Sequence, residues 1–150
     1  MWFFERMSNR VDDIISRVRN HFVGTDDKKF SETFIRQEKA VFDGWLRGKC
    51  EEIKSLAVLH AGHGLANERG IGVVSGGVDV EGDANKPSSV TLREGDADNW
   101  GRAVFRFGTD GATFNSVEIT KTVAGKVVED YILEPGDNGI SLRSRVNPTV

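Results

Sequence analysis

The stretch RAVFRFGTDGATFNSVEITKTVAGKVVEDYILEPGDNGISLR, residues 102–143, decides the fold. Its first segment alternates, so that every second residue from Ala103 to Phe107 is apolar, which is typical of a half-buried strand. Signals for tight turns follow at Gly108, Ala124 and Pro135, where small and turn-forming residues cluster. The stretch therefore predicts four short strands joined by three turns, which is an antiparallel meander.

One irregularity is expected in the second of these strands, roughly 112–123. Val117 and Ile119 share a face, whereas Phe114 falls on the opposite face if the strand is regular. A β-bulge inserts one extra residue, so the residues before it point to the opposite face of the sheet from the one that a regular strand would give them. The sequence therefore predicts a bulge near Asn115.

Upstream of the meander, residues 77–81 and 88–93 alternate as strands, which makes about six strands between Ile71 and Arg143. The glycine-rich segment 70–76 has a weak likeness to a phosphate-binding loop. A strand rather than a helix follows it, so the sequence argues against a dinucleotide site.

The N-terminal residues 2–22 predict an amphipathic helix with an apolar seam of coiled-coil spacing. The seam consists of Phe4, Met7, Val11, Ile14, Val18 and His21. Three interpretations are open: a helix packed on its own domain, an oligomer interface between subunits, and a helix lying on a membrane surface.

A second helix is expected over about 27–61, with an apolar stripe that includes Phe42 and Ile53. Gly44 and Gly48 lie four residues apart inside it, and each costs about 1 kcal/mol relative to alanine in a helix interior. They predict either a kink or break near Gly48, or a helix contact at which another helix backbone comes close. Cys50 is expected to be a small buried apolar group.

These elements predict an α+β protein: an N-terminal two-helix segment followed by an antiparallel β-sandwich or small barrel of about six strands. The expected division is a helical segment, 1–66, and an antiparallel β domain, 67–150. Whether the helices pack on the sheet or project from it is left open by the sequence.

Composition limits the classes of function. The chain has 150 residues, a formal net charge of −3 and one cysteine. The charge gives no general attraction to nucleic acid or to anionic lipid, and a single cysteine excludes an intramolecular disulfide. The apolar start at residues 1–4 is too short for a secretory signal, so we expect a chain that is made in the cytoplasm and is not exported by that route.

Three candidate sites are weighed. Alternating acids in two similar turns could meet at one end of the sheet and bind calcium, or they are solvated loops; they are Asp79, Glu81, Asp83, Glu94, Asp96 and Asp98. His60 and His63, three apart at a helix end, could face a metal, or they serve the helix terminus. Trp100 and Asp110 could form a ligand site on loops, where an aromatic face stacks on a sugar.

The leading hypothesis is a non-enzymatic structural subunit that self-associates or docks into a larger protein assembly, such as a phage or virion component. That step is an analogy of architecture. The first alternative is a carbohydrate- or lipid-binding β module around Trp100. The second is a metal-assisted hydrolase that uses His60, His63 and one of the acids. No nucleic-acid partner is expected, and nothing specific in the sequence supports a membrane or glycan partner.

Overall fold

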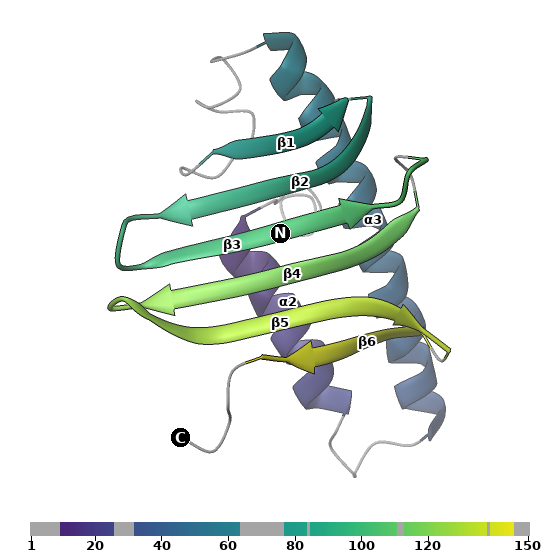
Figure 1. The fold of residues 1–150 in the computed structure, drawn as a ribbon. Coiled ribbons are helices and arrows are strands. Elements are labelled where there is room, and N and C mark those ends of the chain that lie inside the picture. Colours follow the sequence, from purple (N-terminus) through teal and green to yellow (C-terminus); the bar gives the residue numbers. More distant parts are fainter. Residues whose placement is uncertain are drawn as a thin grey trace.

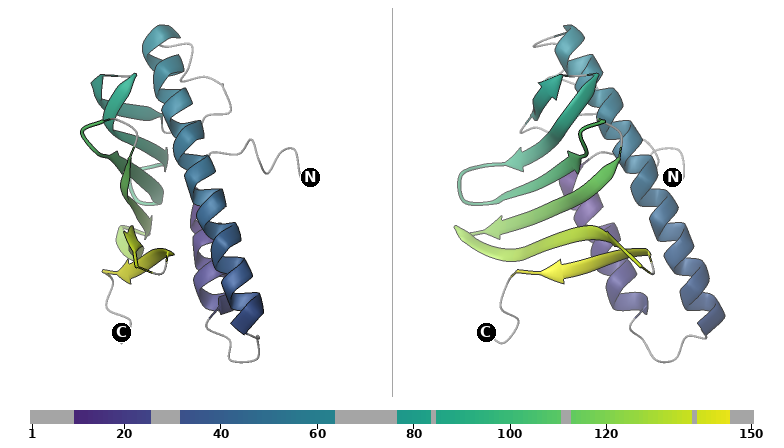
Figure 2. Two further views of the ribbon diagram at one scale, coloured as in Figure 1. Left: turned by 90° about the vertical axis from the view of Figure 1, so that its right-hand side faces the viewer. Right: turned by 45° about the vertical axis from the view of Figure 1, so that its right-hand side comes forward.

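The protein consists of two layers, a β-sheet and a pair of helices that cover one of its faces (Figures 1 and 2). The computed structural model describes residues 10–25, 32–63, 77–83, 85–110, 113–137 and 139–145. The helices pack on the sheet rather than projecting from it, and both layers contribute to one hydrophobic core. The α+β prediction is therefore confirmed.

The strands lie close to their expected positions, whereas the first helix is described from Val11 and extends to Thr25, beyond its expected end at residue 22. The helices are α2, Val11–Thr25, and α3, Glu32–His63. The strands are β1, Val78–Asp83; β2, Lys86–Gly95; β3, Trp100–Phe107; β4, Phe114–Val123; β5, Lys126–Gly136; and β6, Gly139–Ser144.

The six strands form one antiparallel sheet in the order β1-β2-β3-β4-β5-β6, so the predicted meander is confirmed. The prediction of a β-sandwich or small barrel is not confirmed. Among the described strands β1 and β6 remain edges that do not pair with one another, so the sheet is open. Helices, rather than a second sheet, supply the layer that its apolar face requires.

The inner face of the sheet carries the core residues of the strands. Val90, Phe105, Val117 and Leu133 are paired in one row across β2 to β5, and each is fully buried. The row beside it pairs Leu92, Ala103 and Ile119, which are also fully buried. Because neighbouring residues of a strand point to opposite faces, the residues between these rows form the outer, solvent-facing side.

The bulge predicted near Asn115 is confirmed. Arg106 pairs with Ser116 and Phe107 pairs with Phe114, so Asn115 is the extra residue in β4. The insertion brings Phe114 into the same core as Val117.

The connection between β4 and β5 is a two-residue turn. Ala124 and Gly125 both have positive φ, 54° and 79°. Two-residue hairpin loops of this kind match the right-handed twist of the flanking strands. The register is thereby set for the pairing of Val123 with Lys126.

Helix α2 lies against the inner face at β2 and β3. Its approach is close at Gly101, where an added Cβ would lie 2.9 Å from Cγ1 of Val11. Polar contacts tie the start and the middle of the helix to the sheet: a carboxylate oxygen of Glu94 accepts the Asp12 amide at 2.8 Å, and Arg19 donates to Glu129 at 2.6 Å. A carboxylate at the first turn is favourable because the N-terminal amides of a helix lack intrahelical partners.

Helix α3 crosses the sheet and contacts β1, β2 and β6. Its inner side contains the apolar stripe expected from the sequence, of which Phe42, Leu46 and Ile53 are fully buried. Cys50 lies in the same cluster, and burial raises the pKa of its thiol to about 12, as expected for an inert apolar group. Asp43 accepts the amide of Ile140 at 3.4 Å and so ties α3 to the start of β6.

Candidate functional site

The outer side of α3 carries an exposed row of residues at alternating spacings of four and three. We call this row the α3 outer stripe; it consists of Gln37, Val41, Gly44, Gly48, Glu51, Ser55 and Val58. Val41 is 59% exposed and Val58 is 44% exposed, and both belong to the few large apolar side chains that are exposed in the described part of the chain. Figure 2 shows that α3 belongs to the helical layer and that one side of this layer faces the sheet.

The two glycines of the α3 outer stripe have open space beside them. A Cβ added at Gly44 or Gly48 would meet nothing within 4 Å. Helix α3 runs without interruption through both, from Glu32 to His63, so a break near Gly48 is excluded. The alternative prediction was a close approach of another helix backbone, and within the described part of the chain none lies beside these glycines.

The apolar seam of the first helix is buried within the single chain, whereas an oligomer interface would need it on the surface. Val11, Ile14 and Val18 are at most 1% exposed in the single chain, where they pack in the core shared with the sheet. They are therefore not available to a second subunit. Phe4 and Met7 lie outside the described residues.

Between the helices, His21 is enclosed by aromatic rings. Its imidazole stacks on Phe42 with centroids 4.0 Å apart, and Phe22 meets it edge-on at 4.7 Å. Its Nδ1 lies 3.2 Å from a carboxylate oxygen of Glu38, which also pairs with Arg17 at 3.3 Å. Burial lowers the pKa of His21 below its ordinary value, although Glu38 acts in the opposite direction.

The two acidic turns do not meet, so that prediction is wrong. The turn after β1 and the turn after β2 lie at opposite ends of β2. Within the described residues, no three His, Cys, Asp or Glu side chains are grouped so that they could hold a metal ion.

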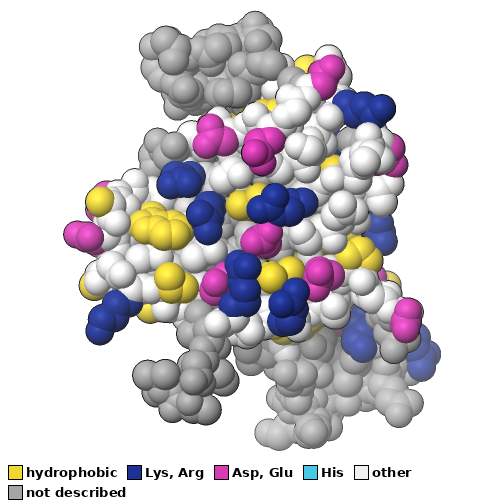
Figure 3. Space-filling model, viewed as in Figure 1, with side chains coloured by type: hydrophobic (Ala, Val, Ile, Leu, Met, Phe, Trp, Pro, Cys, Tyr) yellow, Lys and Arg dark blue, Asp and Glu magenta, His cyan; other side chains and the backbone are white. Residues whose placement is uncertain are grey.

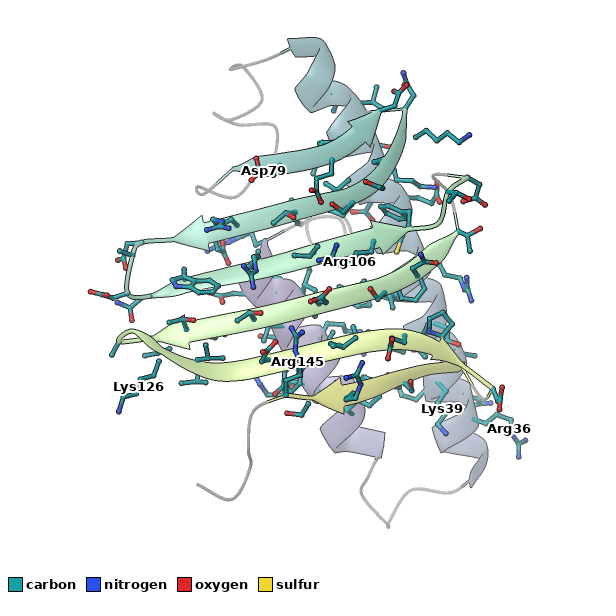
Figure 4. The ribbon with its side chains drawn as sticks, viewed as in Figure 1. Arg36, Lys39, Asp79, Arg106, Lys126 and Arg145 are labelled. Atoms are coloured by element: carbon teal, nitrogen blue, oxygen red, sulfur yellow. The ribbon has the colours of Figure 1, made fainter. Side chains whose placement is uncertain are left out.

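The acids of these turns have local partners instead. Asp83 accepts the amide of Asn85 at 2.9 Å, and Glu81 accepts the hydroxyl of Ser89 at 2.6 Å. Asp96 accepts the amides of Asp98 and Asn99 at 3.0 and 2.8 Å, and these bonds lower the pKa of its carboxyl group. The remaining acids are placed separately: Glu94 at the start of α2, and Asp79 on the outer face of β1 (Figure 4).

Trp100 and Asp110 are not brought together. Trp100 is the first residue of β3, whereas Asp110 follows the far end of that strand. Asp110 accepts the amide of Thr113 at 2.8 Å and so closes the turn between β3 and β4. A single site built from both side chains is therefore excluded, and Trp100 remains as a candidate by itself.

Trp100 borders a shallow hollow of about 320 Å³ where the turns of β2–β3 and β4–β5 meet the start of α2. The hollow is lined by charges of both signs, including Arg10, Glu94 and Lys121. Lys121 pairs with Asp12 at 2.9 Å, and Arg10 approaches Glu94 at 4.0 Å. These contacts connect the helix to the sheet, so the lining charges have structural partners.

The outer face of the sheet is open to solvent and carries interleaved charges (Figure 3). Arg106 pairs with Glu118 at 2.6 Å, and Arg145 pairs with Asp130 at 2.6 Å and with Glu118 at 3.3 Å. Arg106 lowers the pKa of the Glu118 carboxyl group, chiefly through their hydrogen bond. Figure 4 labels Arg106 and Arg145 on this face.

Several sequence predictions fall where nothing is described. The side chains of His60 and His63 lie outside the described residues, as does segment 70–76. The outer stripe of α3 was missed apart from its glycines, although the same spacing of four and three links Val41 and Val58 to them in the sequence.

Comparisons with protein-family models, with curated proteins and with solved structures found no match. In the part of the chain that the structure describes, no helix is both long enough and apolar enough to cross a membrane.

Proposed function

We propose that the protein is a non-enzymatic structural subunit that self-associates through the α3 outer stripe. The observation that carries the proposal is the pair of exposed glycines at the middle of a long helix, flanked by exposed valines. The partner is a second copy of the chain.

The glycines support the proposal because each of them lowers the stability of the helix. A glycine in an exposed helix interior destabilises the helix by about 1 kcal/mol relative to alanine. Neither Gly44 nor Gly48 gives room to a neighbour within the described chain. Small residues at spacings of four let two helix backbones approach closely, so a second helix would give both glycines a role that offsets their cost.

The order of residues along the stripe favours an antiparallel pair. When two copies of α3 run in opposite directions, Val41 of one lies opposite Val58 of the other, and Gly48 lies opposite Glu51. Arg47, which is exposed beside the stripe, then comes near Glu51 of the other copy. Such a contact is the same on both subunits, as the two-fold symmetry of a dimer requires.

The test is the mass in solution, measured by light scattering after size exclusion at two concentrations. We expect a dimer that Val41→Asp converts to a monomer, because a carboxylate would be buried at the contact without a partner. Val127→Asp is the matched control, since Val127 is 47% exposed on the β4–β5 hairpin. It should leave the mass unchanged. A wild-type monomer at both concentrations would contradict the proposal.

A charge exchange tests the direction of the helices. Arg47→Glu should weaken the dimer because it would face Glu51 of the other copy, and Arg47→Glu combined with Glu51→Arg should restore it. Restoration depends on the antiparallel register, so failure of the double variant would count against that register even if Val41→Asp dissociates the dimer.

A further inference from the structure

Two arginines on the outer face of the sheet lie directly opposite each other. Arg93 of β2 is the register partner of Arg102 of β3. Neither forms an ion pair with a described acid, whereas Arg106, Arg143 and Arg145 on the same face all do. Like charges that are directly opposite across two strands destabilise a sheet.

The acidic residues nearest to this pair either form ion pairs with other arginines or form no ion pair with Arg93. Glu118 and Asp130 are held by Arg106 and Arg145. Asp79 of β1 pairs in register with Thr91, one position diagonal from Arg93, and makes no ion pair with it. The arginine pair is thus a local site of uncompensated positive charge in a chain of net charge −3.

An aromatic ring adjoins the arginine pair. Trp100 precedes Arg102 by two residues, so both point to the outer face, and the Arg102 guanidinium lies 5.4 Å from the centre of the indole. Trp100 is half-buried and pairs in register with Thr122. We call Arg93, Trp100, Arg102 and Thr122 the Trp100 platform.

The platform also contains unsatisfied polar atoms. Nε of Arg102 and Oγ1 of Thr122 are the two buried side-chain polar atoms that lack a hydrogen-bond partner among the described residues. Buried polar groups are satisfied in the great majority of cases, and each exception requires an explanation. Both exceptions adjoin the same tryptophan, which points to a ligand whose polar groups engage this part of the sheet.

We propose that the Trp100 platform binds an anionic sugar residue, one that carries a carboxylate or a sulfate group. The anion is held between Arg93 and Arg102, because a guanidinium matches the geometry of such groups with two parallel donors. The ring of the sugar packs against the indole of Trp100.

A single charged sugar suits this surface better than a nucleic acid does. An extended polyanion gains its affinity by neutralising many phosphates along a strand. The rest of the outer face alternates its arginines with Glu118, Asp130 and Glu134, which would repel such a chain. The proposal is independent of self-association, because the platform lies on the outer face of the sheet, whereas the helical layer that contains α3 covers the inner face (Figure 2).

The test is an NMR titration that follows the Nε–H signals of the arginines and the indole N–H of Trp100. The probes are glucuronate and galactose 6-sulfate, with glucose, inorganic sulfate and an oligothymidylate as the neutral, the sugar-free and the nucleic-acid probes. We expect one or both anionic sugars to shift the signals of Arg93, Arg102 and Trp100 together, and glucose to shift none of them. The two anionic probes distinguish a carboxylate from a sulfate.

Two variants support the assignment. Arg93→Gln should weaken binding at least tenfold, whereas Arg143→Gln, which alters an arginine of the same face paired with Glu134, should change it less than twofold. Without ligand and at low salt, Arg93→Gln should also raise Tm, because it removes the repulsion. Each of three results would overturn the proposal: neither anionic sugar shifts these signals, inorganic sulfate shifts Trp100 equally, or only an oligothymidylate does so.

Discussion

His21 is enclosed between α2 and α3, where only 4% of the residue is exposed. The imidazole stacks on Phe42 and so fits as a flat ring between the helices. Glu38 favours the protonated imidazole, but Arg17 nearby opposes it, and burial is the largest influence on the pKa of His21, which it lowers. The charged groups around the ring, which include Asp43, therefore do not offset the cost of protonating a buried imidazole.

This burial makes stability depend on pH. In the unfolded chain His21 binds a proton at about pH 6.5, whereas in the fold it does so only at lower pH. The free energy of unfolding should accordingly fall as the pH drops below about 6.5, by at most about 1.4 kcal/mol per pH unit for one proton. The loss should end below the pKa of the folded state.

His21→Phe removes the titrating group and keeps an aromatic ring against Phe42. Urea denaturation from pH 7.5 to 5 should show a flatter dependence for this variant than for the wild-type protein. His60 and His63 are present in both proteins, so their contributions cancel in the comparison. Equal slopes for the two proteins would show that His21 does not titrate differently in the fold.

At the scale of elements, the seam of α2 and the α3 outer stripe share the spacing of a coiled coil, but of these two rows only the seam of α2 is buried. The seam of α2 is in the core, whereas the outer stripe of α3 is exposed. The spacing identifies a helix face but not the surface that covers it. The sequence therefore predicted the helices, and it could not determine which helix faces are buried in the core and which are left exposed.

Gly48 permits a test in which two properties change in opposite directions. Gly48→Ala should raise the free energy of unfolding by about 1 kcal/mol at concentrations where the chain is monomeric, because alanine favours the helix and its Cβ meets no neighbour. The same methyl group should weaken self-association, because it would stand where the second helix approaches.

The control for this substitution is Gly125→Ala. Gly125 has a φ of 79°, which is costly for a residue with a side chain, so this variant should be less stable by about 1 kcal/mol and should associate normally. Denaturation at low concentration and light scattering at high concentration provide the two measurements. A Gly48→Ala protein that is more stable and associates as tightly as the wild type would exclude Gly48 from the contact.

The strands show where sequence reasoning succeeds and where it was incomplete. The bulge at Asn115 was predictable because Phe114 and Val117 had to share a core that a regular strand would not give them. The prediction that the two acidic turns meet was wrong, and the sequence was sufficient to avoid it. Two turns that flank a single strand must lie at its opposite ends. The register that places Arg93 opposite Arg102 was not predictable, because it depends on the length and form of the loop between β2 and β3.

At the scale of the whole molecule, the number of strands did not determine the architecture. Six alternating strands are compatible with a sandwich, a barrel or an open sheet, because each buries one apolar face and exposes one polar face. In this chain the second layer comes from α2 and α3, which contribute residues such as Ile15 and Leu46 to the same core as Phe105. The expected division into a helical segment, 1–66, and a β domain, 67–150, thus cuts through one shared core.

The shared core predicts that neither segment folds by itself. Without the helices, the sheet would expose six fully buried large side chains: Val90, Leu92, Phe105, Val117, Ile119 and Leu133. Each contributes about 1.5–3 kcal/mol when it is buried, and a typical domain is stable by only about 5–15 kcal/mol in total. Segment 67–150 alone should therefore give a poorly dispersed NMR spectrum, and addition of segment 1–66 should restore the spectrum of the intact chain.

The intact chain nicked between residues 66 and 67 is the control, and it should keep its dispersed spectrum because both parts of the core are present. Cooperative unfolding of segment 67–150 alone would mean that the sheet is an independent domain and that the helices contribute little to its stability.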